Sequence, residues 1–125
     1  SGGVLLAAVP NDFSAAQMLA VELKETARPY WWIDPTHLNY WTPATFANLL
    51  GRHGFRVVEQ TTQYQIESMI GAGHDYPANP EIGAKLHERV RERDLAMPRD
   101  ERMARYGRQA REGRGREIIV IAVKE

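Results

Sequence analysis

Three segments that suit strands are spaced along the chain. Val4–Val9 and Ile118–Val123 are continuous apolar runs, and Phe55–Thr62 is a shorter mixed run. A run that is apolar on both faces is typical of a strand covered by helices on both sides. The sequence therefore predicts three strands, with the two doubly buried ones at opposite ends of the chain. The turn Pro10-Asn11-Asp12 ends the first strand.

A first helix is expected over Phe13–Thr26, directly after this turn. Asp12 or Ser14 is available as its N-cap. Three apolar side chains share one face of it: Met18, Leu19 and Leu23. An irregular, aromatic-rich segment follows from Pro29 to Trp41.

The next helix has a signal at each end. Thr42 is a good N-cap with Pro43 at the first helical position, and Gly54 is placed to end the helix with a positive φ. Four side chains lie on one side of it: Phe46, Leu49, Leu50 and His53. The strand at Phe55 follows Gly54 directly, so the pattern predicts a helix, a tight turn and a strand.

Between the second and third strands, residues 64–116 form a loop and a helical insertion. The loop-like part is followed by a charged helix over Glu81–Leu95, and Pro98 separates it from another helix over Arg99–Glu112. With no internal repeat, residues 1–125 form a single α/β domain. We expect about three strands, with four or so helices.

Composition excludes several classes of protein. The 125 residues carry 16 basic and 16 acidic side chains, so no net charge favours nucleic acid or anionic lipid. Cys is absent, which excludes disulfides and thiolate chemistry. The apolar runs are too short to cross a bilayer, and no basic-then-apolar signal segment opens the chain. We therefore expect a cytoplasmic protein without a membrane partner.

Three motifs in order resemble the C-terminal half of class I S-adenosylmethionine-dependent methyltransferases: "GGVLLAAVPND", "HLNYWTPATFANLLGRHGFRVVE" and "GREIIVIAVKE". The resemblance covers Gly2–Gln60 and Gly115–Glu125, and it implies a partial Rossmann-like fold that starts at the family's fifth strand. It also implies that the last strand returns antiparallel between the other two. The insertion at Pro80–Glu112 is similar to one that some members place before the last strand.

The cofactor-binding motif of that family has no counterpart in this chain. Members hold S-adenosylmethionine with a glycine-rich loop after the first strand and an acidic residue at the end of the second. Gly71-Ala72-Gly73 lacks a third glycine, and Gly113-Arg114-Gly115 precedes a strand, whereas such a turn opens a helix. The resemblance thus implies a substrate-side portion that is inactive alone, with the N-terminal half of the parent enzyme and an unidentified methyl acceptor as partners.

Two groups of polar residues are candidates for substrate binding. Asn11 and Asp12 lie at the carboxyl end of the first strand, where open α/β sheets gather ligands, although both are also common turn and cap residues. His37, Asn39 and Tyr40 precede the Thr42 cap, in a loop that the resemblance puts over the substrate side of the cleft. His37 could act as a general base, and Asn39 or Tyr40 could hydrogen-bond a substrate hydroxyl. The alternative is that the histidine bonds to nearby backbone while Tyr40 packs under the loop.

Aromatic and histidine residues offer weaker signals. Trp32, with Trp31 and Trp41, could stack on a flat substrate, but tryptophans more often form core or interface surface. The histidines include no pair at helical metal-ligand spacing, and His74-Asp75 alone is not a metal site. We therefore expect no metal.

An arginine repeats at every third position from Arg99 to Arg114. Each successive arginine slips about 60° around a helix, so the row winds around it instead of forming one basic face. Residues 88–117 hold ten Arg against seven acidic residues, a net charge of +3. A solvated, salt-bridged helix is the better interpretation.

Two further hypotheses stay open. The chain could be a stand-alone module that binds a protein or nucleic acid through its aromatic loop and charged helices. An unprotected first strand also predicts a homodimer through that strand or the aromatic loop, because Leu5 and Leu6 would otherwise face water.

Overall fold

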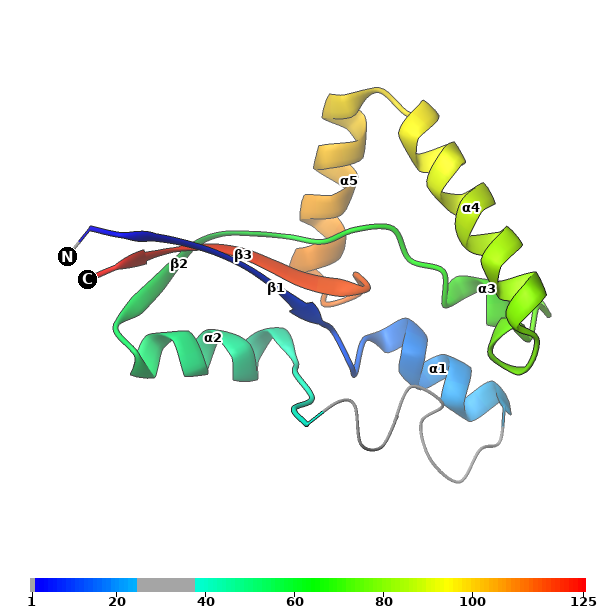
Figure 1. Ribbon diagram of the computed structural model, residues 1–125, viewed down its shortest axis with the longest axis horizontal. Helices are drawn as coiled ribbons and strands as arrows, with labels where there is room; N and C mark the ends of the chain where they lie inside the picture. The colour runs from blue at the N-terminus through cyan, green and yellow to red at the C-terminus, as the bar shows by residue number, and fades with distance from the viewer. Residues whose placement is uncertain (1, 25–37) are drawn as a thin grey trace.

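One three-stranded sheet organises the protein. The computed structural model describes residues 2–24 and 38–125 (Figure 1). Its strands are β1 (Val4–Pro10), β2 (Phe55–Thr61) and β3 (Glu117–Lys124). The strand order is β1-β3-β2, and β3 is antiparallel to both neighbours. The expected α/β class and the central, antiparallel position of the last strand are confirmed.

The pairing register fixes which side chains share a face. Leu5 lies opposite Ala122 and Leu6 opposite Ile121, so alternate residues of the two strands point to opposite sides of the sheet. On β2 the register shifts between Val57 and Glu59, which marks a bulge. The bulge brings polar Glu59 onto the face of Leu6 and Ile121.

Helix α2 (Pro43–Arg52) has the ends that the sequence predicts. The Thr42 hydroxyl accepts from the Thr45 amide at 3.2 Å, and the Thr45 hydroxyl accepts from the Thr42 amide at 2.9 Å. This reciprocal pair satisfies two amides that the helix leaves free. Gly54 has φ +71°, which a residue with a side chain adopts at a cost, and β2 starts at the next residue.

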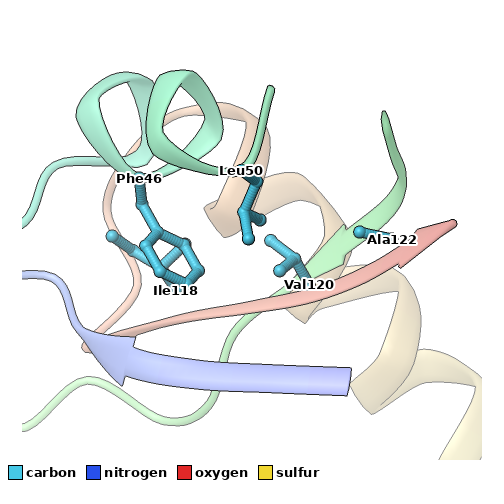
Figure 2. Close-up of a cluster of buried hydrophobic side chains, with 5 residues drawn as sticks. All are labelled: Phe46, Leu50, Ile118, Val120 and Ala122. Atoms are coloured by element: carbon cyan, nitrogen blue, oxygen red, sulfur yellow. The ribbon is translucent and has the colours of Figure 1, made fainter. Parts of the chain in front are cut away.

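The hydrophobic core lies between α2 and the central strand. Figure 2 shows Phe46 and Leu50 of α2 against three side chains of β3: Ile118, Val120 and Ala122. All five are buried. Leu5 of β1 and Val57 of β2 pack around this cluster, so one face of all three strands contributes to it. Burial of these apolar side chains is the main stabilising contribution to the fold.

The opposite face of the sheet is more open than the sequence predicts. Val4 and Leu6 are each 70% exposed, and Ala8 is exposed too. The double coverage that the apolar runs predict is therefore wrong for β1, and β3 is fully buried only on its α2 side. The exposure of Leu6 instead agrees with the expectation that an unprotected first strand faces water, whereas Leu5 packs against the core. The reason is topological: α5 (Arg99–Arg111) packs on β2, on the far side of the sheet from α2, and leaves β1 bare (Figure 1).

Helix α1 (Ala15–Lys24) begins where Ser14 caps it. The Ser14 hydroxyl accepts from the Gln17 amide at 3.3 Å, and the Gln17 side chain accepts from the Ser14 amide at 3.2 Å. Of the two expected caps Ser14 is confirmed, whereas Asp12 bonds elsewhere. The apolar face is only half covered, because the short helix α3 (Ser68–Gly71) is what packs against α1. Three side chains remain about half exposed: Met18, Leu19 and Leu23.

The segment between β2 and β3 contains more structure than the predicted loop and two helices. It adds α3 and the 3₁₀ helix η1 (Tyr76–Ala78) to α4 (Pro80–Ala96) and α5. The helices α4 and α5 form a V whose connecting turn lies far from the sheet, while the other end of α5 meets β2 (Figure 1). Asp94 on α4 is buried and accepts from Arg105 and Tyr106 on α5, which holds the two helices together. No helix in residues 2–24 and 38–125 is long and apolar enough to span a membrane.

Candidate functional site

Asn11 fastens the carboxyl end of β1 to the turn that precedes β3. Its side-chain nitrogen donates to the carbonyls of Gly113 at 3.0 Å and Gly115 at 2.8 Å. Its backbone amide donates to the Arg116 carbonyl at 3.0 Å. The side chain is buried, and its own oxygen has no hydrogen-bond partner in the part of the chain that the structure describes. Asn11 therefore sets the path of residues 113–116.

Asp12 makes an equivalent connection to the start of α2. Its side-chain oxygen accepts from the Trp41 amide at 2.8 Å, and its backbone amide donates to the Trp41 carbonyl at 3.0 Å. The residue is buried. Asn11 and Asp12 thus have the structural role that their turn chemistry predicts, and ligand contact by either of them stays a prediction.

A cavity of about 340 Å³ opens beside this end of β1. One wall is apolar and comes from α1, and the other wall comes from the segment after β2 and from the turn before β3. The α1 residues are Ala15, Ala16, Leu19, Ala20 and Leu23, and the facing residues are Gln65, Glu67, Gly71 and Arg114. Its size is at the lower end of the range for small-molecule sites.

Glu67 is the buried ionisable group of this cavity. Its side chain is 3% exposed, with one carboxylate oxygen 3.5 Å from the Arg116 guanidinium. The other oxygen, Oε2, is buried and has no hydrogen-bond partner among the described residues. Burial raises the pKa of the Glu67 carboxyl, and the nearby Arg116 charge opposes this rise. An unpaired oxygen at this depth is costly and marks a place where a donor would bind favourably.

Arg114 forms the rim of the cavity, and its position depends on Asn11. It lies between Gly113 and Gly115, whose carbonyls the Asn11 side chain binds. Its Nε donates to the Glu112 carboxylate at 2.8 Å. The exposed Arg114 is therefore held near the mouth of the cavity in two ways. The Asn11 side chain fixes the backbone on either side of it, and Glu112 binds its guanidinium group.

The glycine at position 115 is required by a close approach. A Cβ there would overlap the Thr62 side chain. Thr62 is buried, and its hydroxyl donates to the Glu117 carbonyl at 2.6 Å and accepts from the Glu117 amide at 3.3 Å. The end of β2 and the start of β3 are thus locked together at the base of the site.

Two of the predicted loop candidates, Asn39 and Tyr40, lie within the described residues. Asn39 is exposed and Tyr40 is half-buried, and neither lines the walls of the cavity beside α1. Trp41 packs edge-on against Phe46, with ring centres 5.5 Å apart, as a core side chain. Trp32 and His37, like Trp31, lie outside the described residues, so their predicted roles stay predictions.

A second cluster surrounds His87 on α4. The Tyr64 hydroxyl lies 3.3 Å from His87 Nδ1, and the rings of Tyr64 and Tyr76 each stand edge-on to the imidazole at 6.0 Å. Burial and, secondarily, the Arg116 charge lower the pKa of His87. Both effects favour the neutral ring. An open cavity of about 300 Å³ adjoins it, next to Glu88 and Arg91.

Sequence reasoning missed the polar residues that line the first cavity, Gln65, Glu67 and Arg114, and Arg116, which lies beside Glu67. They come from two segments separated by the whole helical insertion, so no local pattern connects them. One signal was available, because Glu67 lies in the mainly apolar stretch "IESMI", and a charged residue that is buried in such a stretch requires a partner.

The first cavity offers hydrogen-bonding groups and one carboxyl group opposite an apolar wall, an arrangement that suits the binding of a small molecule.

No group of three or more His, Cys, Asp or Glu in residues 2–24 and 38–125 is arranged to hold a metal ion. In comparisons with known proteins, no family model, no curated protein and no solved structure matches the chain.

Proposed function

We propose that the chain forms the substrate-side portion of a class I S-adenosylmethionine-dependent methyltransferase. In this role it contributes sheet core and part of the substrate cleft, and it is inactive alone. The supporting observation is the sheet order β1-β3-β2, with β3 antiparallel between two strands that run in the same direction. The capped helix and Gly54 that lead into β2 agree with the motif that carries the resemblance.

The position of the cavity agrees with this proposal. Open α/β sheets bind ligands beyond the carboxyl ends of their strands. Asn11, Asp12 and the cavity beside α1 all lie at this end of β1. In the proposal the methyl acceptor occupies this side, and S-adenosylmethionine is held by the N-terminal half of the parent enzyme.

The free edge of β1 supplies the place for that half. β1 pairs with β3 on one side only, among the described strands, and its outer face carries the exposed Val4 and Leu6. An apolar edge strand without a neighbour tends to pair with another strand. The proposed partner therefore adds a strand beside β1 and covers its bare face.

The experiment is to read the coding sequence upstream of Ser1 and to assay its full-length product. The proposal expects a glycine-rich strand-helix unit there, followed by an acidic residue at the end of the next strand. It also expects transfer of a labelled methyl group from S-adenosylmethionine by the full-length product. A coding sequence without such a unit, or a full-length product that does not bind the cofactor, would overturn the proposal.

The open β1 edge also favours a second candidate, an interaction module that assembles by pairing with itself. If two copies paired their β1 edges about a two-fold axis, their sheets would join into one continuous six-stranded antiparallel sheet. This candidate fits a protein partner better than nucleic acid, because Arg105 is paired with the buried Asp94 and Arg102 donates to the Asp94 carbonyl at 3.2 Å.

A further inference from the structure

We propose that the cavity between α1 and residues 65–71 binds a neutral, amphipathic molecule that has a small apolar body and one hydroxyl group, such as an alkylphenol. The inference stands on the cavity itself and does not rest on the proposed methyltransferase function. Three properties of the walls indicate the ligand: a buried acceptor without a partner among the described residues, charges of both signs, and an apolar helix face.

The polar head of the ligand is indicated by Glu67. Its side chain is only 3% exposed, and within residues 2–24 and 38–125 Oε2 has no hydrogen-bond partner, while Oε1 lies 3.5 Å from the Arg116 guanidinium. Glu67 lines the cavity, and a ligand O–H would supply the missing donor once the side chain turns the buried Oε2 toward it. A hydroxyl can accept as well as donate, and Gln65 in the same wall has a buried amide nitrogen without an acceptor.

The mixed charges around the cavity favour a neutral head group over an ionic one. A ligand carboxylate would lie against the Glu67 carboxylate at low dielectric, which is unfavourable. A ligand ammonium would lie near two guanidinium groups, that of Arg116 beside Glu67 and that of Arg114 on the rim. A neutral donor avoids both repulsions.

The apolar body is indicated by α1. Leu19 and Leu23 are 53% and 54% exposed, and both line the cavity together with Ala16 and Ala20. The small alanine side chains leave space for a ligand, and the leucines supply the apolar surface that the ligand would cover. A cavity of about 340 Å³ has room for one substituted aromatic ring but not for a large cofactor.

The test is a titration of the isotope-labelled chain, followed by the backbone amide signals in NMR spectra. The probes are two isomers, 4-ethylphenol and 4-methylanisole, together with the cationic 4-methylbenzylamine. We expect 4-ethylphenol to bind with a Kd on the order of 1 mM, as suits about nine heavy atoms. The ether, which cannot donate, and the amine should each bind at least about tenfold more weakly.

Two variants on α1 locate the site. Ala16→Phe fills the cavity and should abolish binding of 4-ethylphenol, whereas Met18→Phe, at a position outside its lining, should leave the Kd within about twofold. If Ala16→Phe does not fold, intermolecular NOEs from 4-ethylphenol to the Leu19 and Leu23 methyl groups decide the location.

Four results would overturn the proposal. They are no binding of 4-ethylphenol, equal binding of the isomeric ether, tighter binding of the amine, and NOEs or variant effects that place the ligand elsewhere. Because no cofactor is present in the titration, these results are independent of whether the full-length product transfers methyl groups.

Discussion

The Asn11 side-chain amide donates a hydrogen bond of 2.8 Å to the Gly115 carbonyl, which joins the end of β1 to the start of β3 across most of the chain. A second bond from the same nitrogen reaches Gly113 at 3.0 Å. These bonds hold Arg114 and Arg116 where they meet the cavity and Glu67. The site therefore depends on a residue that does not line it.

Asn11→Asp tests this connection. The variant keeps the shape of the side chain but replaces the donor by a carboxylate oxygen that faces two carbonyl oxygens. We expect the free energy of unfolding at pH 7 to fall by about 3 kcal/mol, because a buried charge loses solvation without gaining a partner. Urea unfolding measures the change, and Asn39→Asp at an exposed position is the control, with an expected change within about 0.5 kcal/mol. Similar small losses in both variants would contradict the role of Asn11.

The junction from α2 to β2 gives a matched pair of glycine variants. Gly54→Ala should lower stability by about 1 kcal/mol because of the positive φ, and Gly54→Val should lower it more. Gly51→Ala, inside α2 with open space around it, should instead raise stability by up to about 1 kcal/mol. Thr42→Ala should cost about 1 kcal/mol through the lost cap. Thermal unfolding compares the four, and an unchanged melting temperature for Gly54→Val would mean that the junction is misinterpreted.

Sequence predicted the elements whose signals are local. Thr42, Gly54 and the apolar runs each mark an element within a few neighbouring residues, and the structure has α2, β2 and β3 within one or two residues of the expected bounds. The apolar run alone predicted the coverage of β1 wrongly, since it cannot tell which face a distant helix will pack on. The exposure of Leu6 was expected only because the first strand has no residue that protects its edge. The pairing of Glu67 with Arg116 could not be predicted either, because the path of the insertion brings the two together.

The pH dependence of stability follows from the raised pKa of Glu67. Between its ordinary value of 4.5 and the raised value, the folded state binds more protons than the unfolded state. Its contribution to the free energy of unfolding is therefore fully present below pH 4.5 and is lost as pH rises through the raised pKa. As the pH rises from 4 to 7, the wild type should lose stability relative to Glu67→Gln. The unfolding free energy of the wild type minus that of the variant should therefore decrease.

His87 provides the control with the opposite sign. Its pKa is lowered from 6.5, so its contribution is fully present above pH 6.5 and is lost as pH falls through the lowered pKa. The difference between wild type and His87→Gln should therefore grow as the pH rises. A difference for Glu67→Gln that grows over the same range would contradict the burial argument.

Self-association through β1 is tested by light scattering at micromolar concentration. We expect a mass of at least twice 14.2 kDa, because the unpaired edge and the exposed Leu6 bury against a second copy. Leu6→Lys should shift the protein to a monomer, whereas Leu95→Lys, at an exposed position on α4, should leave the mass unchanged. Leu38→Lys, at an exposed position in the aromatic-rich segment, distinguishes the two possible interfaces. It should leave the mass unchanged if β1 is the interface and lower it if the aromatic loop is the interface. A clean monomer of the wild type at these concentrations would rule the assembly out.

The central claim is that this chain is the substrate-side portion of a methyltransferase and lacks the cofactor-binding portion. Calorimetric titration with S-adenosylmethionine, carried out on this chain and on the full-length product of its gene, tests it most directly. The account predicts no measurable binding to residues 1–125 alone and binding with a Kd in the micromolar range by the full-length product. Low-micromolar binding by the 125-residue chain itself, or none by the full-length product, would contradict it.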